Sequence, residues 1–181
     1  MSGYCDTAPG HPVHASYHDT EYGFPVRDDP VLLERFALEI MQAGLSWEIT
    51  LKKRAALFEA FEGFIPERVA AYGLADRERL LANPGIIRNR LKIDAIIRNA
   101  GIICALRPEY GSFAGWLDAH HPLEKAAWTK LFKKTFSFTG GEIVGELLMS
   151  TGYLPGAHRA DCPIQARILA QDPPWRRGAG A

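Results

Sequence analysis

Apolar residues recur at intervals of three and four along much of the chain, which is the spacing of amphipathic helices. Around the stretch LEIMQAGLSW this spacing predicts a helix over residues 30–43, with Asp29 as its N-terminal cap. Gly44 is expected to end that helix in a left-handed conformation. Ser46 is then placed to cap a second helix, over about residues 47–61.

The helical pattern continues toward the C-terminus, whereas strand-like alternation is limited to residues 136–138. Residues 1–27 mix Gly, Pro, His and aromatic residues and are expected to be irregular. We therefore expect an all-α fold, with one helical domain over residues 1–165 and a flexible tail over residues 166–181, which ends in DPPWRRGAGA. The further helices predicted are Pro66 to Gly73, Arg77–Ala82 with Asp76 as cap, about Asn89 to Leu106, two around Trp116 and Trp128, and Glu142–Ser150.

Length and charge narrow the classes of protein. A chain of 181 residues is long enough to bury a core as one domain. Its formal net charge is zero, so any contact with nucleic acid must come from local basic patches. We expect no membrane segment and no signal peptide, because no apolar run is long enough and the N-terminus lacks the basic-then-apolar layout. Three scattered cysteines argue against a disulfide scaffold and favour a cytoplasmic location.

The corner between the first two long helices could form a small pocket. Glu39 and Gln42 are three residues apart and share one helix surface, and Trp47 follows the corner at Gly44. With Tyr17 from the N-terminal segment, they could bind a flat, electron-poor ligand. The stretch alone favours the plainer alternative, in which the two polar side chains face solvent and the indole packs in the core.

Cysteine and histidine residues from the two ends of the chain form a candidate metal site. His158 and Cys162 have a spacing that lets both reach one ion, and Cys5 and His18 could complete a tetrahedral Cys₂His₂ zinc site. The alternative is a free thiol with surface histidines, since six histidines in a chain of this size produce chance pairs.

A helix, a tight turn at Asn83-Pro84-Gly85 and a second helix give a helix-hairpin-helix layout over about residues 77–100. Amides that follow Gly85 could bind a DNA phosphate, and Arg88, Arg90 and Lys92 make the local charge positive. The segment alone is equally compatible with an ordinary helical hairpin that has a solvated basic face.

Together these features resemble the 3-methyladenine DNA glycosylase I family. The resemblance runs in order from Cys5 to Cys162, and its most specific parts are YHD, QAGLSW and the terminal His-x3-Cys. The matching residues are Tyr17-His18-Asp19, Glu21, Gly23, Leu38-Glu39, Gln42 to Trp47, Lys52-Lys53-Arg54, Gly85 to Arg88, Lys92-Ile93, Ala95 to Ile97, Asn99-Ala100, Leu131 to Lys134, Phe136, Phe138, Gly140, His158 and Cys162.

The resemblance implies the helix-hairpin-helix glycosylase fold, with a structural zinc bound by Cys5, His18, His158 and Cys162. It implies a damaged nucleotide flipped out of double-stranded DNA, with Glu39 as the catalytic carboxylate. A cationic methylated base would stack on an aromatic ring. The residues expected to bind the base are Tyr17, Trp47, Gln42 and His14, and those expected to contact DNA are Gly44, Leu45, Gly85, Ile86, Arg88, Arg90 and Lys92.

The chain also departs from the family pattern. Thr7 stands where an aromatic residue usually helps to close the pocket, His14 where Tyr is frequent and Tyr22 where Trp is frequent. The loop before His158 is one residue longer. The second wall of the pocket therefore has no assigned residue.

We expect a monomeric, monofunctional glycosylase that excises 3-methyladenine from alkylated DNA. Arg88 lies near the place of the lyase lysine in bifunctional relatives, and no Asp lies near Ala105, where many of the superfamily have a catalytic one. One alternative is a non-catalytic sensor of alkylated DNA with the same fold. Another is a zinc hydrolase. A site with four protein ligands counts against this alternative, because it leaves zinc no open position for a substrate or water.

Overall fold

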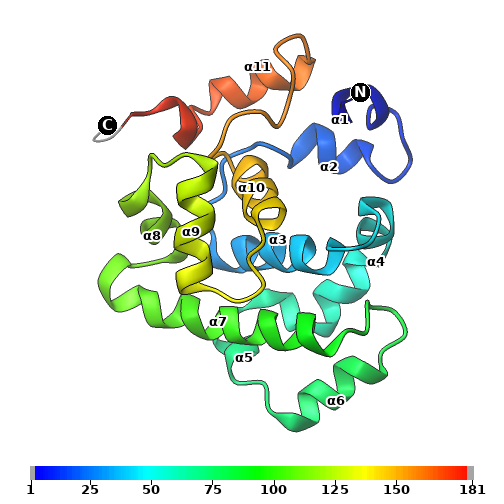
Figure 1. The fold of residues 1–181 in the computed structure, drawn as a ribbon. Coiled ribbons are helices and arrows are strands. Elements are labelled where there is room, and N and C mark those ends of the chain that lie inside the picture. Colours follow the sequence, from blue (N-terminus) through cyan, green and yellow to red (C-terminus); the bar gives the residue numbers. More distant parts are fainter. Residues whose placement is uncertain (1–2, 179–181) are drawn as a thin grey trace.

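The computed structural model describes residues 3–178, and within that range it consists of helices and loops without strands (Figure 1). The all-α expectation is confirmed. No helix in this range is long and apolar enough to cross a membrane. The elements are α1 (Tyr4–Thr7), α2 (Ala15–Thr20), α3 (Asp29–Gln42), α4 (Trp47–Ala60), η1 (Glu62–Phe64), α5 (Pro66–Ala70), α6 (Leu74–Ala82), α7 (Arg90–Tyr110), α8 (Phe113–His120), α9 (Lys125–Thr135), α10 (Gly141–Ser150), α11 (Pro163–Ala170) and η2 (Pro174–Arg176).

Helix α3 lies at the centre of the fold and packs against α4, α7, α8 and α10 (Figure 1). Its middle turns are buried on every side, so that even charged side chains such as Arg35 and Glu39 are almost inaccessible to solvent. An aromatic cluster fills the space toward α8 and α9, where the ring of Phe36 lies 5.5 Å from that of Phe136 and 5.8 Å from that of Phe132. The core therefore fixes the helix that carries the candidate catalytic residue.

Several local expectations need correction. Helix α3 begins at Asp29 itself, and the Asp29 carboxylate accepts a hydrogen bond from the amide of Phe113 at 2.9 Å instead of capping its own helix. Helix α6 begins at Leu74, so Asp76 lies in its first turn and accepts from the Gly73 amide at 3.1 Å. The N-terminal segment, expected to be irregular, contains the short helices α1 and α2.

The expected flexible tail over residues 166–181 is wrong for the part that the structure describes. Helix α11 extends through Ala170, and the turn η2 follows it. Pro174 is buried, and the amide of Trp175 donates to the carbonyl of Gly152 at 3.1 Å. Packing and a backbone hydrogen bond outweigh the polar, Pro-rich composition here. Residues 179–181 lie outside the described range.

The corner between α3 and α4 has the predicted turn chemistry. Gly44 adopts a φ of +80°, a conformation that L side chains rarely adopt, and it follows the end of α3 as a C-terminal cap residue does. The hydroxyl of Ser46 accepts a hydrogen bond from the amide of Ile49 at 3.2 Å and caps α4. The corner thus projects as a defined turn at one end of the central helix.

Lys92 corrects an expectation about DNA contact. Its side chain is buried, and its ammonium group donates to the carbonyls of Met41 at 2.8 Å and Ala43 at 2.6 Å. These carbonyls belong to the end of α3, where helical carbonyls lack partners within the helix. Lys92 therefore holds α7 against the corner instead of presenting its charge to a phosphate.

Replacing Lys92 tests this structural role. We expect Lys92→Met to lower the free energy of unfolding by about 2 kcal/mol, because two charge-assisted hydrogen bonds to partly buried carbonyls are lost. Urea unfolding measures the change. Arg90→Met is the matched control, since Arg90 is exposed two residues earlier and its loss is expected to change stability by less than about 0.5 kcal/mol. Equal stabilities of the two variants would contradict the assignment.

Candidate active site

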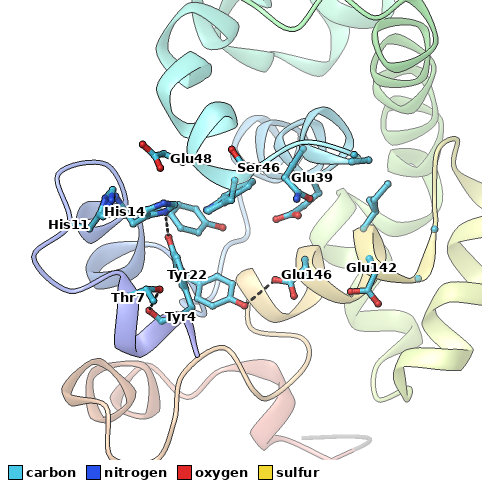
Figure 2. A pocket seen from close by; sticks show the side chains of 18 residues that line it. Tyr4, Thr7, His11, His14, Tyr22, Glu39, Ser46, Glu48, Glu142 and Glu146 are labelled. Atoms are coloured by element: carbon cyan, nitrogen blue, oxygen red, sulfur yellow. Dashed lines mark hydrogen bonds between the residues drawn. The ribbon is translucent and has the colours of Figure 1, made fainter. Parts of the chain in front are cut away.

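A pocket of about 990 Å³ opens between the N-terminal helices, the corner at Gly44 and the start of α10 (Figure 2). Glu39 reaches it from α3, and Trp47 from the first turn of α4. Segments far apart in the sequence therefore build one cavity. The residues that define its floor and walls are Tyr4, Tyr17, Tyr22, Glu39, Trp47 and Glu146.

Aromatic rings line one side of this pocket. The rings of Tyr17 and Trp47 meet edge to face with centroids 5.2 Å apart, and the ring of Tyr22 lies 5.7 Å from that of Tyr17. Tyr4 meets Tyr22 edge to face at 5.4 Å, and its hydroxyl is 3.2 Å from Nδ1 of His14 (Figure 2). Such rings favour a flat or cationic ligand.

Tyr4 supplies the wall for which the sequence offered no residue. Thr7 lines the cavity from α1 but brings no ring, whereas Tyr4 lies one turn earlier on the same helix. Its position directly before Cys5 was the available signal, because a metal ligand fixes the residue beside it. His14 lines the pocket as expected and positions the Tyr4 hydroxyl.

Glu39 is the most deeply buried carboxyl group of the pocket, with 5% of its surface exposed. Burial, aided by the nearby charge of Glu146, raises the pKa of Glu39 to about 8, although Arg35 acts in the opposite direction. The carboxyl group is therefore mainly neutral at neutral pH when the pocket is empty. A positively charged ligand would lower its pKa and draw out its proton.

Behind the pocket, an ion-pair network holds Tyr17 in place. The guanidinium of Arg35 donates to the Tyr17 hydroxyl at 2.9 Å and lies 4.8 Å from the centre of its ring. Arg54 binds both carboxylate oxygens of Glu21 at 2.8 Å and also contacts Glu34 at 2.7 Å. Arg54, the last residue of the KKR segment, therefore belongs to the ion-pair network that supports the site.

Glu146 and Tyr22 are pocket residues that sequence reasoning did not connect. The Tyr22 hydroxyl donates to Oε2 of Glu146 at 3.0 Å, across 124 residues of chain (Figure 2). Glu146 is half-buried on α10, where the helical pattern alone marks it as an ordinary polar position. Only the packing of α10 against α3 brings this second carboxyl group toward Glu39.

The four expected metal ligands come together. The ligand atoms of Cys5, His18, His158 and Cys162 all lie within 4.8 Å of one another, so the cluster could hold a metal ion. Sγ of Cys162 is 3.4 Å from Nδ1 of His158 and 3.9 Å from Nε2 of His18, and Sγ of Cys5 is 3.6 Å from Nδ1 of His158.

The outer nitrogens of the two histidines support this assignment. Nε2 of His158 is 2.7 Å from the carbonyl of Tyr22, and Nδ1 of His18 is 2.7 Å from Oδ1 of Asp19. Such bonds place the proton on the outer nitrogen and leave a lone pair on the nitrogen that faces the cysteines, as metal-ligating histidines require. The donor set and its orientation fit zinc.

A second group of possible ligands, His11, His14 and Glu48, lies at the pocket mouth. The Lys52 ammonium is 2.6 Å from Oε1 of Glu48 and already neutralises that carboxylate. This group is therefore a weaker metal site than the buried cluster.

The corner residues proposed for DNA contact are accessible. Gly44 is exposed, and Leu45 has 39% of its surface exposed at the tip of the turn beside the pocket. Gln42 lines the pocket, and its amide group donates to the Leu45 carbonyl at 2.9 Å. The side chain that was expected to bind the base thus also braces the corner.

The hairpin differs in detail from the expectation. The Gly85 amide donates to Oδ1 of Asn83 at 2.9 Å, and the Ile86 amide donates to the Asn83 carbonyl at 3.4 Å. These two amides are therefore engaged within the turn. The next two, of Ile87 and Arg88, have no acceptor within residues 3–178 and are better placed for a phosphate. Figure 1 shows the hairpin between α6 and α7, and the side chains of Arg88 and Arg90 are exposed.

The profile of the family described as methyladenine glycosylase matches residues 7–128, more than half of the chain. The chain belongs to this family. A DNA-3-methyladenine glycosylase of Haemophilus influenzae is 32% identical over 184 residues, covering 91% of this chain and 99% of the relative. DNA-3-methyladenine glycosylase 1 of Escherichia coli is 35% identical over 151 residues, covering 82% of this chain and 81% of that relative.

Solved structures of family members share the fold. A crystal structure of 3-methyladenine DNA glycosylase I superposes with a TM-score of 0.78 at 36% identity, covering 88% of this chain and 97% of that one. The structure of the Staphylococcus aureus 3-methyladenine DNA glycosylase I, solved to explain 3-methyladenine recognition, superposes with a TM-score of 0.78 at 32% identity. The superposition covers 89% of this chain and 95% of that one. The expected fold class is therefore confirmed. The family profile ends before His158 and Cys162, whereas these relatives match most of the chain.

The raised pKa of Glu39 predicts how stability depends on pH. The folded protein retains the Glu39 proton up to about pH 8, whereas the unfolded chain releases it near 4.5. Unfolding therefore releases a proton between these values, and the free energy of unfolding falls as pH rises. Glu39→Gln lacks this pH dependence. The free energy of unfolding of the variant minus that of wild type is therefore expected to rise between pH 4.5 and pH 8, by at most about 5 kcal/mol.

Thermal unfolding of both proteins across this pH range measures the difference. Glu142→Gln, at an exposed position, is the control and should track wild type at every pH. A constant difference between Glu39→Gln and wild type would show that Glu39 is ionised in the folded protein.

Proposed function

We propose that this protein is a DNA repair glycosylase that flips an alkylated nucleotide out of double-stranded DNA and hydrolyses the bond between 3-methyladenine and its sugar. The main support is a buried carboxyl group, Glu39, inside an aromatic pocket beside an exposed turn. The names of the relatives support the same substrate. An extrahelical base fits such a cavity, because enzymes that act on a base must first take it out of the stack.

The chemistry of the lesion suits the pocket. N3-methylated adenine in DNA is cationic, so it attracts the faces of Trp47 and Tyr17 and an ionised Glu39. When the glycosidic bond breaks, its electron pair moves to the base and neutralises the base's charge. Water then forms the new bond to the sugar and loses a proton. Because the leaving group is already activated, positioning and electrostatics supply the catalysis.

We infer a monofunctional enzyme. Strand cleavage by a bifunctional glycosylase needs an amine that forms a Schiff base with the sugar. Arg88 occupies the region of that lysine, and a guanidinium does not act as this nucleophile at neutral pH. Lys92, the nearest lysine in the sequence, is buried and bound to two carbonyls.

DNA is proposed to bind along the corner and the hairpin. Leu45 and Gly44 would enter the duplex where the flipped base was, while the Ile87 and Arg88 amides and the Arg90 side chain contact phosphates. A net charge of zero means that these local groups must supply the electrostatic attraction. We propose that the enzyme acts as a monomer in the cytoplasm.

Zinc is the proposed occupant of the Cys5, His18, His158 and Cys162 cluster. It would supply a structural cross-link between the two ends of the chain, and four protein ligands leave no position for a reacting water. This arrangement counts against a zinc hydrolase.

Base release from methylated duplex DNA tests the activity. Wild type is expected to release 3-methyladenine, and Glu39→Gln to reduce the single-turnover rate by at least about 100-fold, because the buried charge that faces the cationic base is lost. Separation of the released bases identifies the product, and Glu109→Gln, at an exposed position outside the pocket, is the control.

Two results would contradict the proposed activity or mechanism. Undiminished release by Glu39→Gln would remove Glu39 from the mechanism. Folded wild-type protein that binds an abasic-site analogue but releases no base would be a damage sensor instead of an enzyme.

Cys162→Ser tests the metal assignment. We expect bound zinc to fall well below one equivalent and Tm to fall by about 5–10 °C, the shift for a loss of 2–3 kcal/mol in a chain of this size. Metal analysis and thermal unfolding give both values. Cys104→Ser is the control, since Cys104 lies outside the cluster on α7. A full equivalent of zinc in Cys162→Ser would overturn the assignment.

A further inference from the structure

Glu146 adds a second carboxyl group to the pocket. It projects from α10 toward the cavity that Glu39 reaches from α3, and the hydroxyl of Tyr22 donates to it at 3.0 Å (Figure 2). Neither a lysine nor an arginine forms an ion pair with Glu146 in residues 3–178. Of the four glutamates that line the pocket, Glu48 and Glu142 pair with lysines, whereas Glu39 and Glu146 have no ion-pair partner among the described residues.

The two carboxyl groups act on each other. Glu146 is the largest electrostatic contribution to the raised pKa of Glu39, after burial. The pKa of Glu146 is itself raised by burial, with a further contribution from Glu142, while the Tyr22 hydrogen bond and Lys125 lower it. In an empty pocket, ionisation of one group opposes ionisation of the other.

We propose that Glu146 is a specificity-determining residue that, together with Glu39, makes the pocket select positively charged alkylated bases over neutral bases of the same shape. This inference rests on the proposed glycosylase function. A cationic base offsets the repulsion between two carboxylates, so both can ionise against it. A neutral base offers no such compensation and gains nothing from the second acid.

Structural requirements do not explain a carboxylate at this position. Helix α10 is held by Val144, Leu147 and Leu148, which are buried on its other side. The hydroxyl of Tyr22 needs only an acceptor, which the oxygen of a glutamine side chain would provide equally well. The negative charge is what glutamate adds.

A pH profile separates a charge effect from a packing effect. Several titratable or charged groups on neighbouring elements interact with Glu39 or Glu146. They are Tyr17 on α2, Tyr22 after α2, Arg35 on α3, Lys125 on α9 and Glu142 on α10. Burial raises the pKa of Tyr17 and of Tyr22 well above the ordinary tyrosine value, so neither phenol titrates between pH 5 and 9. His14 also lines the pocket, and burial lowers its pKa, so wild type and its variants are compared over the whole range to isolate the change that Glu146 alone causes.

The experiment measures single-turnover release of 3-methyladenine from methylated duplex DNA between pH 5 and 9, at several enzyme concentrations. Wild type is compared with Glu146→Gln, with Glu146→Asp, which keeps the charge, and with Glu109→Gln. Glu109 is the control carboxylate, because it is exposed on α7 and does not line the pocket. Binding of a duplex that carries uncharged 3-deaza-3-methyladenine is measured in parallel.

Glu146→Gln is expected to lower the second-order rate constant about tenfold at pH 8 and to move the acid limb of the profile to lower pH, since Glu39 loses its negative neighbour. Its affinity for the uncharged lesion should not fall. Glu146→Asp should keep the wild-type acid limb, and Glu109→Gln should match wild type throughout.

The outcomes distinguish this inference from the proposed function. If wild type releases no base, the glycosylase assignment itself fails. If wild type is active and Glu146→Gln is unchanged, or weakens binding of charged and uncharged lesions equally with an unmoved acid limb, the specificity role of Glu146 is overturned.

Discussion

A carboxyl group buried on the central helix is the constraint around which this structure is arranged. Glu39 sits near the end of α3, where burial makes ionisation unfavourable until an opposite charge arrives. Removing it from water requires walls on every side, and those walls come from α2, α4 and α10. Burial of Glu39 lowers the stability of the folded protein at alkaline pH. The same burial gives the pocket a carboxyl group that attracts a cation once it is ionised.

The corner after α3 depends on that arrangement as well. Two contacts hold it: the buried ammonium of Lys92 binds the carbonyls at the helix end, and the amide of Gln42 binds the Leu45 carbonyl. Gly44 can then turn sharply while Leu45 stays exposed beside the cavity. Under the proposed function, this rigid turn next to the pocket would hold a duplex open while a base lies inside, with little loss of conformational freedom on binding.

The sequence predicted features that depend on neighbouring residues and missed those that depend on packing. Ser46 and Gly44 were predictable because capping and left-handed turns need a particular residue at a particular place. The cluster of four metal ligands was predictable from residue type and from the family resemblance. Lys92 was misassigned because a basic residue after a hairpin reads as a DNA contact, whereas its partners lie about fifty residues earlier in the chain. Glu146 carries no local signal, since only the approach of separate helices gives it a role, and the one signal for Tyr4 was its position beside Cys5.

The possible metal ligands Cys5, His18, His158 and Cys162 are connected to the pocket by direct contacts. Cys5 adjoins Tyr4, whose ring lies 5.5 Å from that of His18 and whose hydroxyl reaches His14. Tyr22, which binds Glu146 through its hydroxyl, accepts a hydrogen bond from His158 through its carbonyl. A metal bound there would therefore fix both the aromatic wall and the partner of the second carboxyl group. Since α1 has only four residues and no buried side chain, it has little packing of its own to hold Tyr4 in place. A metal bound by Cys5, His18, His158 and Cys162 would thus serve the geometry of the pocket as well as the stability of the fold.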